Sequence, residues 1–285
     1  MLVIKEVEIG GKIFSIETGR FAKQASGSVM IRYGDTMVLV TAVSAEEAAP
    51  NQDFFPLQVE YREKTSAAGK IPGGFIKREG RPTEKEILSS RLIDRPIRPL
   101  FPSYFKNETQ VVAFVFSHDG ENDADVLAAV GASAALTISD IPFDGPCAEV
   151  RIGRVNGEFV VNPTIKQLKE SDVELVVAGT SDSIMMVEGE SKEIGEQDLL
   201  DALKFAQIEI KKLVKLQLEL KSEVGKTKRD IQAPVINEEL VNDVMELAFE
   251  KFKEIVHTTL AKEERSAKKQ RTLFICKRKI SGKVS

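Results

Sequence analysis

The stretch from Glu121 to Ser139, ENDADVLAAVGASAALTIS, limits the possible folds of this chain more than any other stretch does. It has the length of a helix, and Asn122 is a residue type that favours the position just before a helix begins. Small residues make the predicted helix slim: Ala128, Ala129, Gly131, Ala132, Ala134 and Ala135. A helix of this kind is suited to packing closely against a sheet, so the stretch predicts a fold of helices on sheets.

Strand patterns lie on both sides of this helix. The apolar runs SVMIRY and TMVLVTAV flank Gly34-Asp35, which predicts a short hairpin turn. The first 62 residues therefore predict antiparallel strands, ending with a strand from Phe54 to Arg62. The run Thr109–Ser117 predicts a buried strand, and more strands are predicted between Ala148 and Met186. Together with the helix, these strands predict the α+β class.

The composition changes after Glu193 to that of amphipathic helices. One helical stripe is Leu199, Leu203, Ala206, Ile210 and Leu213, and a second is Val241, Val244, Ala248, Phe252 and Ile255. Residues 225–234 between them resemble a linker, with lysines and a proline. We therefore expect an α+β domain up to about residue 220, followed by a small helical segment. After Glu264 there are eight Lys and Arg and no acid, and RTLFICKRKISGKVS has no clear helical stripe.

A basic stretch, Gly73 to Pro102, stands out in a chain whose net charge is −4. From Arg62 to Arg98 there are ten Lys and Arg against five Asp and Glu, a local charge of +5. TEKE at 83–86 predicts a capping box that opens a helix, and Pro96 predicts that the helix ends near Arg95.

The cations and the aromatic ring of this stretch suit single-stranded nucleic acid. Lys77, Arg78 and Arg81 lie on the predicted loop with Phe75, so cations can follow the phosphates while the ring stacks on a base. Arg91 and Arg95 are four residues apart and share a helix face; Arg98 follows the proline. The alternative is a surface ion-pair network with Glu79, Glu86 and Asp94, which contributes little free energy.

The acidic run HDGENDAD, His118 to Asp125, has carboxylates at the two-residue spacing of a calcium loop. The glycine and the bidentate glutamate of an EF-hand are missing. Asp123 and Asp125 also suit the first turn of a helix, and we favour that interpretation. Cys147 and Cys276 have no metal-ligand spacing, and no phosphate loop or nucleophile elbow is present. Without a secretory signal or an apolar run of roughly 18–20 residues, we expect a cytoplasmic protein.

The region from Phe54 to Pro102 closely resembles polynucleotide phosphorylase, and the resemblance continues through VGASAAL, IPFDGP and LVVAGT. It covers about residues 1 to 265. The family consists of phosphorolytic 3′→5′ exoribonucleases of mRNA degradation, in which inorganic phosphate releases a nucleoside diphosphate from the RNA end. The resemblance implies a mixed sheet with packed helices, RNase PH-like and similar to domain 2 of ribosomal protein S5, followed by a small all-α segment.

The family's full chain has two RNase PH-like cores joined by a helical domain, then KH and S1 domains, and forms a ring-shaped homotrimer. By this resemblance, 1–220 is the first core, 221–267 is the start of the inter-core helical domain, and 268–285 is a divergent basic tail, as at a frameshift or fragment end. The implied partners are single-stranded RNA and proteins of an RNA-degradation complex, without a membrane. The intact enzyme uses Mg²⁺ and inorganic phosphate, neither of which we expect to bind to this fragment.

The resemblance implies that the catalytic site belongs to the second core, so we expect no catalytic residue and no metal ligand here. The family's phosphate-binding serines fall at 123–125, where Asp123 and Asp125 would repel phosphate. One magnesium aspartate falls at Lys166 and the other is retained as Asp172. What carries over is RNA binding, for which we predict Phe75, Lys77, Arg78, Arg81, Arg91, Arg95 and Arg98. The alternative function is a non-catalytic RNA-binding or ring-assembly subunit of the same fold.

Overall fold

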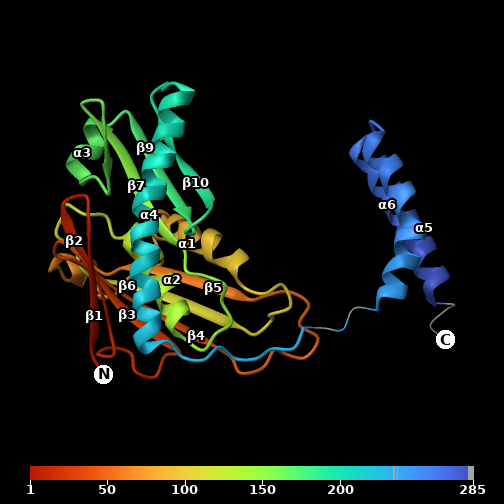
Figure 1. The fold of residues 1–285 in the computed structure, drawn as a ribbon, viewed down its shortest axis with the longest axis horizontal. Coiled ribbons are helices and arrows are strands. Elements are labelled where there is room, and N and C mark those ends of the chain that lie inside the picture. The colour runs from red at the N-terminus through yellow and green to blue at the C-terminus, as the bar shows by residue number, and fades with distance from the viewer. Residues whose placement is uncertain (234, 236, 282–285) are drawn as a thin grey trace. The chain divides into compact units, whose positions relative to one another are not determined.

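The structure is a computed structural model that describes residues 1–233, 235 and 237–281. The chain divides into two compact units, Met1–Ile231 and Gln232–Ser285. The first unit contains two sheets and four α-helices (Figure 1). Its strands are β1 Val3–Ile9, β2 Lys12–Thr18, β3 Gly27–Tyr33, β4 Thr36–Ser44, β5 Leu57–Glu63, β6 Thr109–Ser117, β7 Ala148–Val155, β8 Glu158–Val161, β9 Val173–Gly179 and β10 Ile184–Ser191. Its helices are η1 Thr65–Ala68, α1 Glu84–Ile97, η2 Arg98–Leu100, α2 Asp125–Ile138, α3 Ile165–Glu170 and α4 Glu196–Val224.

The larger sheet has the strand order β1-β2-β3-β4-β6-β5. The hairpin predicted at Gly34-Asp35 is confirmed: Tyr33 pairs with Thr36, and Gly34 has φ +62°. One prediction is wrong, because β5 runs parallel to β6 and not antiparallel. Parallel neighbours need a crossover connection, and here the connection from β5 to β6 carries α1. The sheet is therefore mixed, and this places α1 beside β5.

The slim helix α2 is completely buried and contacts strands of both sheets. Gly131 shows why small residues are needed, since a Cβ there would lie 2.5 Å from Cγ2 of Val40. The predicted cap at Asn122 is wrong: the helix begins at Asp125. The Asn122 side chain instead donates to Oδ2 of Asp119 at 2.6 Å and accepts from Nζ of Lys12 at 2.8 Å. The pattern thus predicted the helix and its packing, but placed its start two residues too early.

The smaller sheet is antiparallel, with the order β10-β9-β7-β8. Helix α4 contacts β1 of the larger sheet and β7, β8 and β9 of the smaller one (Figure 1). Its predicted stripe is confirmed, since Ala206, Ile210 and Leu213 are buried and Leu199 and Leu203 pack against the core.

Residues that follow α4 remain attached to the first unit. The Lys226 N–H donates to the Ile138 carbonyl at 3.0 Å, and the Arg229 N–H donates to the Asp140 carbonyl at 2.8 Å. Lys228 Nζ donates to the carbonyls of Leu136 and Ser139. The boundary between the two units therefore falls after Ile231, beyond the expected end near 220.

The second unit is a pair of helices, α5 Glu238–His257 and α6 Lys262–Ser281, that pack on each other. Ala248 and Ile255 of the predicted stripe are buried. Residues 268–281 of the predicted basic tail continue α6; residues 282–285 lie outside the described residues. Thr272 and Cys276, one turn apart, are buried on α6. Such a narrow buried strip escapes a search for a broad apolar stripe.

Helix α1 begins as predicted and ends later. The capping box is confirmed: Thr83 Oγ1 accepts from the Glu86 N–H at 3.2 Å, and Glu86 Oε2 accepts from the Thr83 N–H at 2.6 Å. The predicted end near Arg95 is wrong, since the helix includes Pro96 and runs to Ile97. A proline this close to the end interrupts one hydrogen bond of the last turn only. No helix of the described residues has the length and apolar character needed to cross a membrane.

Candidate functional site

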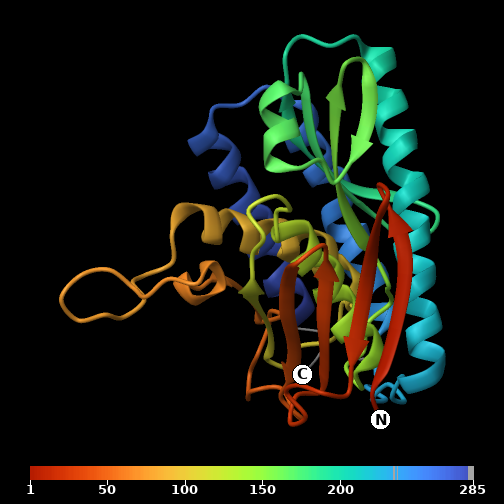
Figure 2. The same cartoon turned by 90° about the vertical axis from the view of Figure 1, so that its left-hand side faces the viewer.

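The predicted RNA-binding loop connects β5 to α1 and extends away from both sheets (Figure 2, orange). Its side chains from Gly73 to Arg78 are exposed, and Phe75 is fully exposed at the tip. Lys77 has φ +54°, a left-handed conformation that non-glycine residues adopt rarely. The loop therefore presents an aromatic ring and two neighbouring cations to solvent.

Ion pairing separates the predicted RNA-binding cations into two groups. Arg95 pairs with Glu188 of β10, and Arg98 pairs with Asp94 at 2.6 Å and donates to the Leu57 carbonyl at 3.1 Å. The other four form no ion pair or side-chain hydrogen bond with any described residue: Lys77, Arg78, Arg81 and Arg91. We call them the unpaired cations.

The three acids of the ion-pair alternative bond to residues other than the unpaired cations. Glu79 accepts hydrogen bonds from Thr65, and Glu86 caps α1 and lies 3.5 Å from Arg62. Asp94 is occupied by Arg98. The ion-pair alternative therefore describes Arg95 and Arg98, whereas the unpaired cations remain available to a polyanion.

A hollow of about 660 Å³ lies along the side of α1. It is lined by residues of α1, the α2 entry and the smaller sheet: Glu84, Lys85, Leu88, Ser89, Leu92, Asp123, Asp125, Arg151, Glu174, Val176, Glu188, Gly189 and Glu190. The two aspartates at the predicted phosphate-binding positions are therefore brought together here. Sequence reasoning missed Lys85, Arg151 and the glutamates, because only the sheet pairing brings them to this place.

Arg151 of β7 occupies the inner end of the hollow. Its guanidinium lies 2.5 Å from Oδ2 of Asp125 and 3.9 Å from Oδ2 of Asp123, and it also pairs with Glu174. Burial lowers the pKa of Arg151, but Asp125 and Asp123 outweigh burial and raise the pKa above its usual value. Burial also raises the pKa of Asp123, but the positive charges of Lys85, at 3.2 Å, and Arg151 lower it by more than burial raises it, so the net shift is downward.

Burial has the largest effect on the pKa of two further carboxyl groups, Asp125 in the lining of the hollow and the fully buried Glu149. Burial raises the pKa of Asp125, and the Arg151 guanidinium opposes that shift. Glu149 is completely buried, and burial together with the charge of Asp125 raises its pKa well above the usual range. Neither of its carboxyl oxygens has a hydrogen-bond partner among the residues that the structure describes. The hollow is thus rich in carboxyl groups, and its inner cation is already paired.

The residues of this hollow do not fit phosphate or Mg²⁺, the two groups that the resemblance implies for the intact enzyme. Phosphate would face the carboxylates of Asp123 and Asp125. Asp172 lies outside the hollow, where Arg154 binds it at 2.6 Å, and Lys166 does not line the hollow either. Among the described residues, no three His, Cys, Asp or Glu side chains are grouped so as to hold a metal ion.

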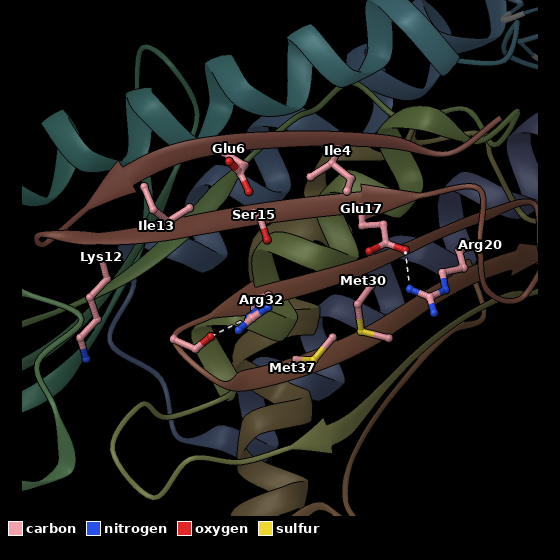
Figure 3. Close-up of a pocket in the computed structure, with 11 residues that line it drawn as sticks. Ile4, Glu6, Lys12, Ile13, Ser15, Glu17, Arg20, Met30, Arg32 and Met37 are labelled. Atoms are coloured by element: carbon pink, nitrogen blue, oxygen red, sulfur yellow. Dashed lines mark hydrogen bonds and ion pairs between the residues drawn. The ribbon is translucent and has the colours of Figure 1, made fainter.

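A second hollow, of about 670 Å³, lies on the open face of the larger sheet between β1 and β4 (Figure 3). Its polar side chains bond to near neighbours: Arg20 lies 3.9 Å from Glu17, and Arg32 donates to the Gly34 carbonyl at 2.9 Å. Ile4 and Ile13 add apolar surface. None of the predicted RNA-binding residues lines either hollow. The hollow beside α1 is distinguished by Asp123 and Asp125, the aspartates at the positions that the resemblance aligns with the phosphate-binding serines.

Comparison of the sequence with known proteins shows the family of this chain. Residues 11–142 match domain 1 of the 3′ exoribonuclease family, and residues 145–209 match domain 2. The chain is 56% identical over 270 residues to polyribonucleotide nucleotidyltransferase of Chlorobaculum tepidum, a match that covers 94% of the chain and 37% of the relative. It is 54% identical to the enzyme of that name from Chlorobaculum parvum over 283 residues, a match that covers 99% of the chain and 38% of the relative. This second match therefore extends into residues 268–285.

The fold is also similar to a solved structure, rice (Oryza sativa) Rrp46. The TM-score is 0.58 at 13% sequence identity, covering 73% of this chain and 93% of that one. Together with the two family matches, this likeness confirms the predicted α+β fold of RNase PH type. The chain spans a little over a third of the length of the curated relatives it matches. It belongs to the 3′ exoribonuclease family, with one match each to domain 1 and domain 2 of that family, and it is similar to a part of polyribonucleotide nucleotidyltransferase.

Proposed function

We propose that this chain is the RNA-guiding part of a polyribonucleotide nucleotidyltransferase, a phosphorolytic 3′→5′ exoribonuclease that degrades mRNA in the cytoplasm. The observation that carries the proposal is the group of unpaired cations on the loop and on α1, together with the exposed ring of Phe75 at the loop tip. Cations that follow phosphates and a ring that stacks on a base are the two elements of sequence-tolerant single-strand binding.

The chain alone would catalyse little. Bond cleavage by phosphate needs a site that attracts an anion and holds a divalent cation. The hollow beside α1 instead has paired aspartates and an internal arginine. The Mg²⁺ and phosphate of the whole enzyme would therefore bind in a second core, and in a homotrimeric ring the loop would lead RNA toward that core.

Fluorescence anisotropy with a labelled oligo(A) strand tests the RNA-guiding role. We expect weak binding at low salt that falls steeply as salt rises, since phosphate contacts release counterions. A fully paired RNA duplex of the same length is the control, because its bases cannot stack on Phe75. Equal affinity for both forms, or no salt dependence, would contradict the proposal.

A further inference from the structure

Glu79 stands at the base of the loop and bonds across it. Its Oε1 accepts a hydrogen bond from the Thr65 N–H at 3.0 Å and a second from Thr65 Oγ1 at 2.9 Å. Thr65 is the first residue of η1, whose Ala67 carbonyl accepts from the His118 N–H at 3.1 Å, just after β6. The chain leaving the loop is thus tied, through one carboxylate oxygen, to a segment attached to the sheet.

The tip of the loop has no comparable attachment. The last backbone hydrogen bond before it joins the Lys70 N–H to the Thr65 carbonyl at 3.0 Å. From residue 71 to residue 78, all of them described, no hydrogen bond or ion pair connects the tip to the rest of the chain. A second link closes the base, from Arg62 Nη2 to the Gly80 carbonyl at 3.2 Å. The position of the tip therefore depends on how firmly its base is closed.

The negative charge of Glu79 is unexpected in a loop that would bind RNA. It lies between Arg78 and Arg81 in the sequence, yet it pairs with neither. A free carboxylate there would only repel phosphate, whereas one bonded to Thr65 holds the cations in place. We propose that Glu79 is a positioning residue that closes the base of the RNA-binding loop. The proposal rests on the proposed RNA-guiding function.

Two neutral variants separate positioning from charge. Glu79→Gln removes the charge but keeps an oxygen that can accept from Thr65, whereas Glu79→Ala removes both. If the carboxylate acts only through its charge, both variants strengthen oligo(A) binding equally. If it closes the loop, Glu79→Ala binds about tenfold more weakly than Glu79→Gln, the effect of one to two lost hydrogen bonds. Equal Kd values for the two variants would overturn the proposal.

A second readout does not depend on RNA. A fluorophore attached through Ile76→Cys reports the local motion of the tip, and both native cysteines are buried. Time-resolved anisotropy should show larger local motion in Glu79→Ala than in Glu79→Gln, which should match the parent. Thr65→Val, which removes only the hydroxyl donor, should lie between them. Equal motion in all four proteins would refute the closure. Altered motion without any RNA binding would leave the closure standing and refute the RNA-guiding function instead.

Discussion

Charge removal from the two groups of cations should affect RNA binding very differently. One double variant, Arg78→Ala with Arg91→Ala, removes two unpaired cations. The matched control, Arg95→Ala with Arg98→Ala, also removes two positive charges, but from arginines already paired with Glu188 and Asp94. Total charge is therefore equal in the two variants, and only the pairing differs.

The magnitude follows from the number of unpaired cations. Each phosphate neutralised on a single strand contributes about −0.7 to the slope of log K against log salt concentration. Four unpaired cations predict a slope near −2.8, so that affinity falls about 50-fold between roughly 50 and 200 mM salt. The unpaired double variant should flatten the slope by about 1.4. The paired control should change it little, because a phosphate must first displace a carboxylate that is already bound.

Anisotropy titrations with labelled oligo(A) at four or more salt concentrations give these slopes directly. The result that would refute the reasoning is an equal change of slope in the two double variants. Ion pairing in the free protein would then have no influence on which cations meet RNA. A slope that stays unchanged in both variants would leave surface ion pairing as the sole role of the stretch.

Three further perturbations follow from the same contacts. Glu188→Gln releases Arg95, so the salt slope measured by anisotropy should become steeper by about 0.7. Arg151→Met leaves the buried carboxyl of Asp125 without its partner and should lower the free energy of unfolding by about 3–5 kcal/mol in urea titrations; a loss below about 1 kcal/mol would contradict the pairing. Partial burial raises the pKa of Asp119, but the N–H groups of residues 122 and 121 outweigh it and hold the pKa below its usual value. The ionised form of Asp119 therefore stabilises the fold above about pH 4, and this contribution is lost as the pH falls through the lower pKa of the folded state. The difference in Tm between the parent and Asp119→Asn should therefore shrink on acidification. A difference in Tm that is independent of pH would contradict this.

Local signals in the sequence predicted local structure well. The capping box at Thr83, the turn at Gly34 and the stripe of α4 each depend on residues a few positions apart. The parallel pairing of β5 was not predictable in this way, since the strand joins β6 across a connection that includes α1. The start of α2 was misplaced because the Asn122 side chain bonds to Asp119 and Lys12 instead of capping the helix.

In the candidate site, too, the sequence predicted the local features and not the tertiary contacts. Residue types predicted a basic loop with an exposed ring, and the structure places Phe75 at its tip. The ion pairs between distant residues could not be predicted from the sequence, because nothing near Arg95 in the chain indicates Glu188 of β10 as its partner. The role of Glu79 was hidden for the same reason, because Thr65 lies fourteen positions before it. Residue chemistry thus predicts which groups can bind a polyanion, and tertiary contacts decide which are free to do so.

The central claim is that this chain binds RNA but does not cleave it. Phosphorolysis of poly(A) by the purified chain, with phosphate and Mg²⁺ present and at an RNA concentration that saturates binding, tests the claim most directly. We predict no phosphate-dependent release of ADP above that of a protein-free control, because Arg151 in the hollow beside α1 is already paired with carboxylates that would repel phosphate. Sustained, phosphate-dependent ADP release by the purified chain would contradict the account.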